Sequence, residues 1–313
     1  MAEEKEVLTG WKKFYDTQYK KLLWLPFLML VIAIFLISLQ YARTGDFLYK
    51  DISLKGGLTI TVFLEKDIDI GALNQELQRA YPDQEITVRS LDSLGKQIGF
   101  IVDSDMDGSQ ESNIGALVLS VSSAIKTPLA QDQYTIEFIG SSLGASFFRE
   151  TIVAVLFAFA FMGLVVILYF RVAIPSLAVI LAAFSDIVVT LAIVNLMGIR
   201  LSTAGIAAFL MLIGYSVDTD ILLSTKLLKR KEGTLMERLI EATKTGMTMT
   251  ATTLVASVLA LIFSESEVIR QIMIILIIGL LVDIINTWIQ NVGILRIYLD
   301  RKHRQAVHHE SQG

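Results

Sequence analysis

The sequence predicts a multi-pass α-helical membrane protein. It would have six transmembrane helices in a 1+5 arrangement, with an extracytoplasmic α+β domain between spans one and two. Composition is the first indication, because 53% of the 313 residues are hydrophobic, 19% are charged and the mean hydropathy is +0.59. The second is that the apolar residues gather in runs of roughly 18 residues or more, the length that crosses a bilayer. The third is one long polar stretch, residues 41–150, between the first run and the other five.

The six apolar runs are residues 22–40, 151–170, 172–197, 201–222, 246–263 and 268–296. We interpret the first as a permanent transmembrane anchor, because no small-x-small cleavage site follows it as it would follow a signal peptide. The other five form a five-helix transmembrane bundle over residues 151–296. The last run is longer than a bilayer requires, so we expect its end to emerge from about Asn291.

The placement of basic residues predicts the orientation. Lysine and arginine are concentrated in residues 1–21, in the loop after span four and after residue 295, whereas the loop after span three contains only Arg200. Because cytoplasmic loops carry an excess of Lys and Arg, we expect both termini on the cytoplasmic side of the cell membrane. Residues 1–21 are then a cytoplasmic N-terminus, and residues 297–313 are a cytoplasmic basic tail.

Residues 41–150 show the patterns of a small folded domain outside the membrane. Nine Lys and Arg stand against sixteen Asp and Glu in this segment, a balance that argues against nucleic-acid binding. The order of expected elements is β-α-β-β-α-β, the ferredoxin-like pattern, which serves many functions. We expect strands at 52–64, 85–91, 97–103 and 133–139, helices at 69–80 and 110–125, and a turn around Ser93-Leu94-Gly95.

Two short motifs in this domain have two interpretations each. Asp103–Gly108 matches the first half of a calcium-binding loop, but the twelfth position is Ile114 instead of glutamate, which favours a simple acidic turn capped by Ser109. Lys55-Gly56-Gly57 interrupts the first strand, as a local bend or as a close approach of two backbones. Histidine occurs only in the tail, so we expect no metal and no cofactor.

Acidic residues inside the apolar runs are the main candidates for function. Each carboxylate costs roughly 2.5–3.5 kcal/mol to insert at a helix centre, so such residues usually mark ion pathways. Asp220 has an alternative, because it lies near the cytoplasmic end of its span and could pair with Lys226 or Arg230 there. The ion-coupling candidates are Asp186 in span three, Asp218 and Asp220 in span four, and Asp283 in span six.

Other polar residues predict a seam between the helices. Asn286 and Gln290 follow Asp283 at helical spacing, on one face of span six. Span five has one stripe of Thr245, Thr248 and Thr252, and another of Gly246, Thr250, Thr253 and Ser257. We expect spans three to six to meet along these side chains, which could also serve only as packing contacts between helices.

Four segments together resemble the SecF family, within the SecD/SecF group of the RND superfamily. They are Leu54-Lys55-Gly56-Gly57, Gly140-Ser141-Ser142-Leu143-Gly144, Phe184-Ser185-Asp186 and Gly214-Tyr215-Ser216-Val217. The run from Asp283 to Asn291 resembles the archaeal type. Bacterial members instead place the span-four acid where this chain has Thr219, and an arginine where it has Thr245.

The resemblance implies an accessory, non-enzymatic subunit of the Sec protein-export machinery. It implies a heterodimer with a SecD-like subunit, contact with the Sec translocon channel and with the translocating polypeptide, and coupling to an ion gradient such as the proton motive force. No nucleic acid is implied, and membrane lipid surrounds the spans. Two alternatives remain open: an RND-like small-solute transporter subunit, and an intramembrane aspartyl protease, which would need paired carboxyls.

Overall fold

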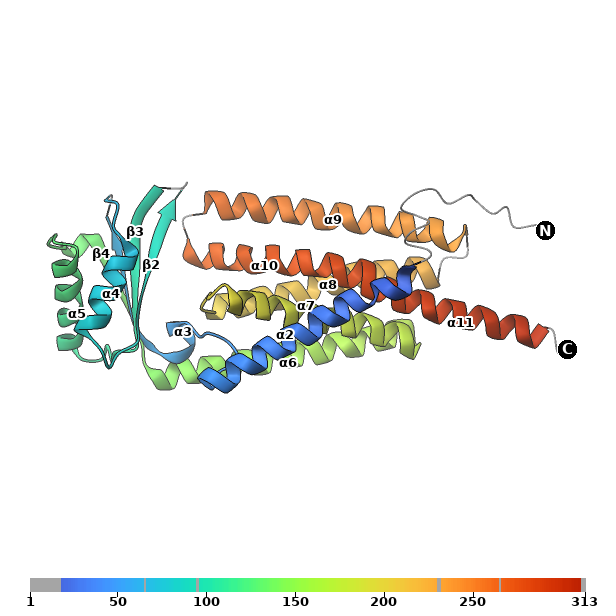
Figure 1. The fold of residues 1–313 in the computed structure, drawn as a ribbon, viewed down its shortest axis with the longest axis horizontal. Coiled ribbons are helices and arrows are strands. Elements are labelled where there is room, and N and C mark those ends of the chain that lie inside the picture. The colour runs from blue at the N-terminus through green and yellow to red at the C-terminus, as the bar shows by residue number, and fades with distance from the viewer. Residues whose placement is uncertain (1–17, 65, 94–95, 230–231, 265, 311–313) are drawn as a thin grey trace.

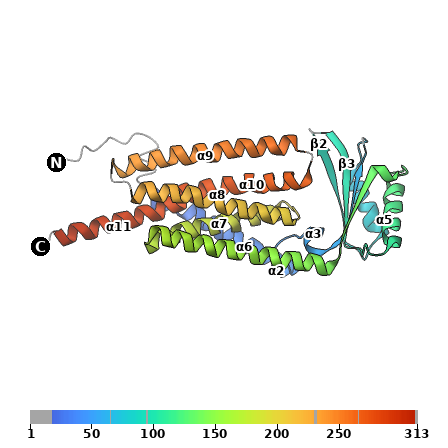
Figure 2. The same cartoon turned by 180° about the vertical axis from the view of Figure 1, so that it is seen from behind.

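The computed structural model describes residues 18–64, 66–93, 96–229, 232–264 and 266–310. A four-stranded sheet with its helices lies at one end, and a bundle of long helices runs away from it (Figure 1). Six described helices are long and apolar enough to cross a membrane. The beginning of α2 (Trp24–Thr44) and the end of α11 (Val292–Glu310) lie at the end of the bundle remote from the sheet (Figures 1 and 2).

The centre of the bundle is formed by two of the spans. In α7 (Ala173–Leu196) and α8 (Thr203–Leu228), 56% of the apolar window is buried, against 17% in α9. Ser202 caps α8 by accepting the Gly205 N–H, and Thr234 begins α9 with a capping box. The other bundle elements are α6 (Ser141–Phe170), α9 (Leu235–Phe263), α10 (Glu267–Ile285) and the π-helical segment η2 (Asn286–Asn291).

The sheet domain contains α3 (Ile52–Lys55), β1 (Gly57–Phe63), α4 (Ile70–Ala80), β2 (Ile86–Ser93), β3 (Lys96–Ser104), α5 (Glu111–Ala124), η1 (Gln131–Gln133) and β4 (Tyr134–Ile139). The strand order is β2-β3-β1-β4, and every neighbouring pair is antiparallel. Alternate residues of β1, namely Leu58, Ile60 and Val62, join Leu77 of α4 and Leu117 of α5 in one buried core. The helices therefore cover one face of the sheet (Figure 2).

The expected first strand, residues 52–64, is wrong at its beginning. Ile52–Lys55 forms a helical turn, and the strand starts at Gly57. Gly56 and Gly57 have φ of +83° and +137°, which side-chain-bearing residues rarely adopt, so the chain turns there. A β-carbon on Gly56 would overlap the backbone of Ser141, and one on Gly144 would overlap the backbone of Gly56. The glycines thus serve a close approach between two backbones, α3 and the start of α6.

Several expected segments have different extents in the structure. The last helix continues through η2 and α11 to Glu310, so the segment expected as a tail is helical over its described part. The Tyr19 hydroxyl donates to Asp300, at 2.7 Å, and the Arg296 guanidinium stacks on the Tyr19 ring. Residues 1–17, Leu94-Gly95 of the expected turn, Arg230 and residues 311–313 lie outside the described residues.

Polar contacts fix the sheet against the bundle. Arg200, between α7 and α8, donates to Glu85 at 2.8 Å and to Thr87 of β2 at 2.5 Å. At the start of α10, Arg270 donates to the Asp92 carbonyl at 3.1 Å. The hydrogen bond from Lys55, together with the positive charges of Lys55 and Arg200, lowers the pKa of Glu85. Strand β2 is therefore bonded to Arg200, just before α8, and to Arg270, near the beginning of α10.

Candidate functional site

Three carboxyl groups meet inside the bundle. Asp186 comes from α7, Asp220 from α8 and Asp283 from α10, and each has an exposed fraction of 0%. Small residues on α7, among them Ala182 and Ala183, are buried beside them and let the helices approach closely. The site is therefore closed to the surface and lies where α7 and α8 pack against the end of α10 and the beginning of η2.

The π-helical segment brings a row of polar side chains to these carboxyls. In an α-helix, Asn286 and Asn291 would be separated by about 140° around the axis, on different sides. In η2 both amides are fully buried, and each donates to a carboxyl of another helix. π-helical turns are rare and frequently lie at functional sites.

The hydrogen bonds of the cluster form three groups. Asp186 accepts from the Ser216 hydroxyl at 2.5 Å and from the Asn286 amide at 2.7 Å. Asp220 accepts from the Asn291 amide at 2.7 Å. In the same group as Asp220, the Thr287 hydroxyl lies 2.9 Å from Asp220 Oδ1 and 3.0 Å from Asp283 Oδ1. In a third group, the Gln290 amide reaches the Ser185 hydroxyl at 3.5 Å.

The charged groups that act on Asp186 and Asp220 are other carboxyls of the cluster. Asp283 acts on both Asp186 and Asp220, and Asp220 also acts on Asp186. None of the ion pairs found among the described residues includes any of the three. Buried acids so close together cannot all be ionised unless a cation compensates their charge. Without such a cation, at least one of them carries a proton. The cluster can therefore take up and release positive charge.

Comparison of the sequence with known proteins identifies its family. The sequence matches the family described as protein export membrane protein SecD/SecF, C-terminal, over residues 121–301. It is 38% identical over 294 residues to the protein-export membrane protein SecF of Pyrococcus furiosus, covering 93% of this chain and 95% of that one. The SecF of Methanothermobacter thermautotrophicus is also 38% identical, over 288 residues. The chain belongs to the SecF family. It is a multi-pass membrane protein of that family.

Solved structures show the same fold. The chain superposes on SecDF from Thermus, described as a translocon-associated membrane protein, with a TM-score of 0.69 and 18% identity. A second SecDF structure, in a super-membrane-facing form, gives a TM-score of 0.57 and 22% identity. The chain spans 95% of its own length in the first match but only 40% of that protein. It therefore corresponds in fold to one part of the longer SecDF chain.

The residues of the SecF-family motif of span four, Gly214 to Val217, do not all face the cluster. Ser216 points to Asp186 inside the cluster, and the Tyr215 hydroxyl bonds to Thr253 of α9. Gly214 is exposed on the outer side of α8. Thr219, at the position of the bacterial acid, is buried and bonds back to the Tyr215 carbonyl at 3.2 Å. Only Ser216 of this motif thus reaches the carboxyls.

Of the two ion-coupling candidates predicted in span four, Asp220 joins the cluster and Asp218 does not. Asp220 does not reach the membrane surface to pair with Lys226; it is fully buried in the cluster, and Lys226 pairs with Glu241 at 3.3 Å. Asp218 is exposed on the outer side of α8 and does not join the cluster. Two residues correspond to about 200° of helix, so only one of the two can face inward.

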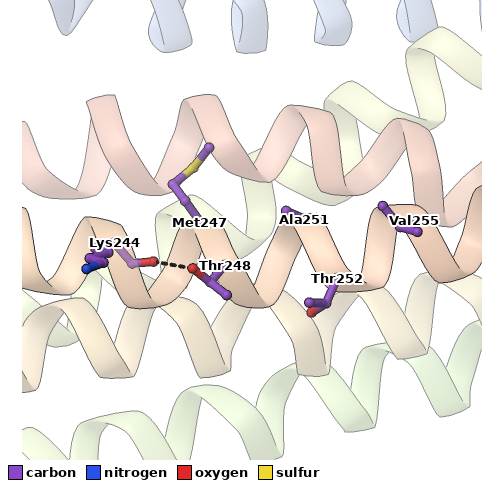
Figure 3. A pocket seen from close by; sticks show the side chains of 6 residues that line it. All are labelled: Lys244, Met247, Thr248, Ala251, Thr252 and Val255. Carbon is purple, nitrogen blue, oxygen red and sulfur yellow. Dashed lines mark hydrogen bonds between the residues drawn. The ribbon is translucent and has the colours of Figure 1, made fainter.

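Of the two stripes on span five that were predicted to join the polar seam, the one formed by threonines alone faces outward instead. Thr245, Thr248 and Thr252 are exposed on α9, where Thr248 and Thr252 line an outer groove with Lys244 and Val255 (Figure 3). Their hydroxyls donate to carbonyls of their own helix at 2.8–2.9 Å. The other stripe faces inward, because the Trp288 ring packs where only Gly246 leaves room. Its buried members are Gly246, Thr250 and Ser257.

Sequence reasoning also missed two members of the site. It did not assign Thr287, although this residue stands four positions after Asp283 and therefore on the same helical face. It also left out Asn291, which lies off the face of Asp283 at α-helical spacing but is turned toward the cluster by the π-helical segment. The polar run from Asn286 to Asn291 was the available signal.

The acidic loop of the sheet domain engages other partners. Asp103 is buried and accepts from Arg89 at 2.7 Å and from Thr59 at 3.1 Å. Asp105 accepts the Glu85 N–H, and Asp107 accepts the Ser109 N–H. These carboxyls therefore stabilise the loop through separate bonds. Within the part of the chain that the structure describes, no group of three or more acidic, His or Cys side chains has an arrangement that could hold a metal ion.

Proposed function

We propose that this SecF-family protein is an accessory subunit of the Sec protein-export machinery, and that ion movement through the Asp186, Asp220 and Asp283 cluster promotes polypeptide translocation. The supporting observation is a cluster of three fully buried, hydrogen-bonded carboxyls without an ion-pair partner among the described residues. Its relatives are named as protein-export membrane proteins, so the proposed role is not enzymatic.

The proposed topology has six spans in a 1+5 arrangement, with both termini in the cytoplasm of the cell. The sheet domain, of ferredoxin-like type, then lies on the outer side, where it can contact an emerging polypeptide. Its strand order, β2-β3-β1-β4, supports this fold assignment. The basic residues after α8, including Lys226 and Lys229, support the orientation.

The structure offers a mechanical connection from the cluster to the sheet domain. Helices α8 and α10 carry Asp220 and Asp283, and strand β2 is bonded to Arg200, just before α8, and to Arg270, near the beginning of α10. A shift between α8 and α10 on ion binding would therefore move β2. One charge crossing 100 mV supplies about 2.3 kcal/mol, which changes a two-state ratio about fifty-fold.

A SecD-like subunit is the proposed partner. Ala207, Met211, Gly214 and Asp218 form one exposed stripe on α8. A carboxylate that faces lipid costs roughly 2.5–3.5 kcal/mol. We therefore propose that a helix of the partner covers this stripe and places a polar group beside Asp218. The fold match to one part of a longer SecDF chain supports a partner that supplies the remainder. We propose that the pair then contacts the Sec translocon channel.

The test replaces Asp186 and Asp283 separately with asparagine and measures export into membrane vesicles under an imposed ion gradient. We expect at least a tenfold loss of the gradient-dependent part of export. Asp132→Asn, at an exposed position of the sheet domain, is the matched control. Normal gradient-dependent export by both cluster variants would disprove the coupling role. Copurification of a SecD-like chain, weakened by Asp218→Leu, would test the partner separately.

A further inference from the structure

A groove between α2 and α7 lies at the end of the bundle that faces the sheet domain (Figure 1). It has a volume of about 240 Å³, and residues from the last turns of both helices line it. On α2, the lining residues Leu36, Gln40 and Arg43 follow one another at helical spacing and therefore share one face. Ala192 and Asn195 do the same on α7. The groove is thus bounded by one stripe of each helix.

The groove is polar toward the sheet domain and apolar toward the middle of the bilayer. Arg43 lies in the last turn of α2, and the exposed Tyr49 lines the same polar end. Tyrosine is enriched where a membrane protein passes from lipid into water. Leu36 precedes Arg43 by two helical turns, which is about 10 Å at the helical rise per residue. The lining therefore changes from polar to apolar over the distance at which a phospholipid does.

Two buried polar atoms of the lining residues have no hydrogen-bond partner among the described residues. They are Nε2 of Gln40, which is a donor, and Oδ1 of Asn195, which is an acceptor. The Asn195 amide is fixed in this orientation, because its Nδ2 donates to the Phe47 carbonyl at 3.0 Å and the reverse orientation would place two oxygens against each other. Buried polar groups in proteins are nearly always paired. A molecule lying in the groove is the nearest source of an acceptor for Gln40 and a donor for Asn195.

Arg43 gives the polar end of the groove a positive charge. None of the ion pairs found among the described residues includes Arg43. The carboxylate of Asp46, three residues later, pairs with Lys50 instead, at 2.5 Å. A guanidinium group binds phosphate through parallel N–H groups, and basic residues near the bilayer surface attract anionic lipids. The position of Arg43 therefore suits a phosphate group.

We propose that this groove binds one anionic phospholipid with a phosphoglycerol headgroup, taken from the leaflet on the side of the sheet domain. The phosphate accepts from Arg43 and Gln40, a glycerol hydroxyl donates to Asn195, and the beginning of a hydrocarbon chain lies against Leu36. Pockets for drug-sized ligands measure roughly 300–1,000 Å³, so a groove of about 240 Å³ holds the headgroup and not the whole lipid. The bound lipid joins the anchor helix α2 to the bundle, and the inference does not depend on ion coupling.

The test uses the full-length protein in detergent, with any chain that copurifies left in place. Native mass spectrometry counts bound phospholipid, and thermal unfolding is followed with added phosphatidylglycerol, phosphatidylcholine or glycerol 3-phosphate. We expect one tightly bound phosphatidylglycerol per chain, and a rise in Tm with phosphatidylglycerol alone. If phosphatidylglycerol neither binds nor raises Tm, or if phosphatidylcholine acts equally, the proposal is overturned. An equal rise with glycerol 3-phosphate would also overturn it, because the groove would then take a soluble phosphate ester and not a lipid.

Matched arginine variants locate the site. Arg43→Gln should weaken phosphatidylglycerol binding about tenfold, the loss expected for one charged hydrogen bond. Arg79→Gln removes an exposed arginine from the last turn of another helix, α4, and should leave the affinity within about twofold. Equal losses in these two variants would refute the assignment to the groove.

A third variant separates binding from folding. Gln40→Leu removes the unpaired donor and keeps a side chain of similar size. It should weaken phosphatidylglycerol binding while the lipid-free protein melts no earlier, because an apolar group in place of an unpaired polar one does not destabilise. Unchanged lipid affinity in this variant would contradict the role of Gln40 as a phosphate donor.

Discussion

Replacing Gly144 with alanine tests whether the backbones of α3 and α6 touch as the structure shows. In an open helix this change stabilises, because alanine is favoured over glycine by about 1 kcal/mol. At Gly144 the new β-carbon would lie 2.8 Å from the carbonyl carbon of Lys55 and nearer still to the Gly56 nitrogen. Backbone atoms cannot rotate away, so α3 must move from α6, and such overpacking costs about 1–3 kcal/mol.

Gly115 is the matched control for this experiment. It lies within α5, and a β-carbon there would meet nothing within 4 Å. Gly115→Ala should therefore stabilise by about 1 kcal/mol, while Gly144→Ala changes stability by a loss of about 0–2 kcal/mol after its own helix preference is subtracted. The two variants then differ by about 1–3 kcal/mol, which at roughly 2–4 °C per kcal/mol is a difference in Tm of about 2–12 °C.

The assay is thermal unfolding of the full-length protein in detergent, with limited proteolysis to report separation of the sheet domain from α6. Gly144→Ala should both melt earlier and be cut faster near residue 140. If Gly144→Ala stabilises as much as Gly115→Ala, the close approach of the two family motifs is refuted.

Three further predictions address the charges and the polar network. Because the Lys55 hydrogen bond lowers the pKa of Glu85, the contact stabilises above the ordinary glutamate pKa and is lost as pH falls through the lowered value. Glu85 is half exposed, so Glu85→Gln should remove at most about 1 kcal/mol, visible as a flatter acid branch in a pH series of melts. Thr287→Val keeps the side-chain shape but removes the hydroxyl between two carboxyls, so gradient-driven export should fall at least tenfold; full export would contradict the network. Thr248→Val should leave export within twofold, because that hydroxyl bonds only to its own helix; a large loss would restore the outer stripe as part of the pathway.

Much of the fold could be predicted because it depends on local patterns. The apolar runs are long enough to identify six helices, and the alternation of residues 133–139 identified a strand. Strand 52–64 was mispredicted at its start because two glycines in unusual conformations end a helical turn there. That conformation depends on the approach of Ser141, which lies far along the chain.

The sequence predicted which types of side chain form the candidate site, but not which of them come together. Sequence showed that carboxyls lie in spans three, four and six, because charge within an apolar run is evident without any coordinates. Helical spacing also placed Asp218 and Asp220 on opposite faces of one helix. It could not say which face was inside, and the same uncertainty led to the choice of the outer threonine stripe.

The sequence by itself determined which segments can cross a bilayer and which of them carry acids, because hydropathy and length are properties of a local stretch. Only the tertiary structure decided that Asp220 rather than Asp218 joins Asp186 and Asp283, and that η2 turns both Asn286 and Asn291 toward them. The inward face of a helix depends on what packs against it. Here small residues on the neighbouring helices and the Trp288 ring set that choice, and neither contact can be read from one segment alone.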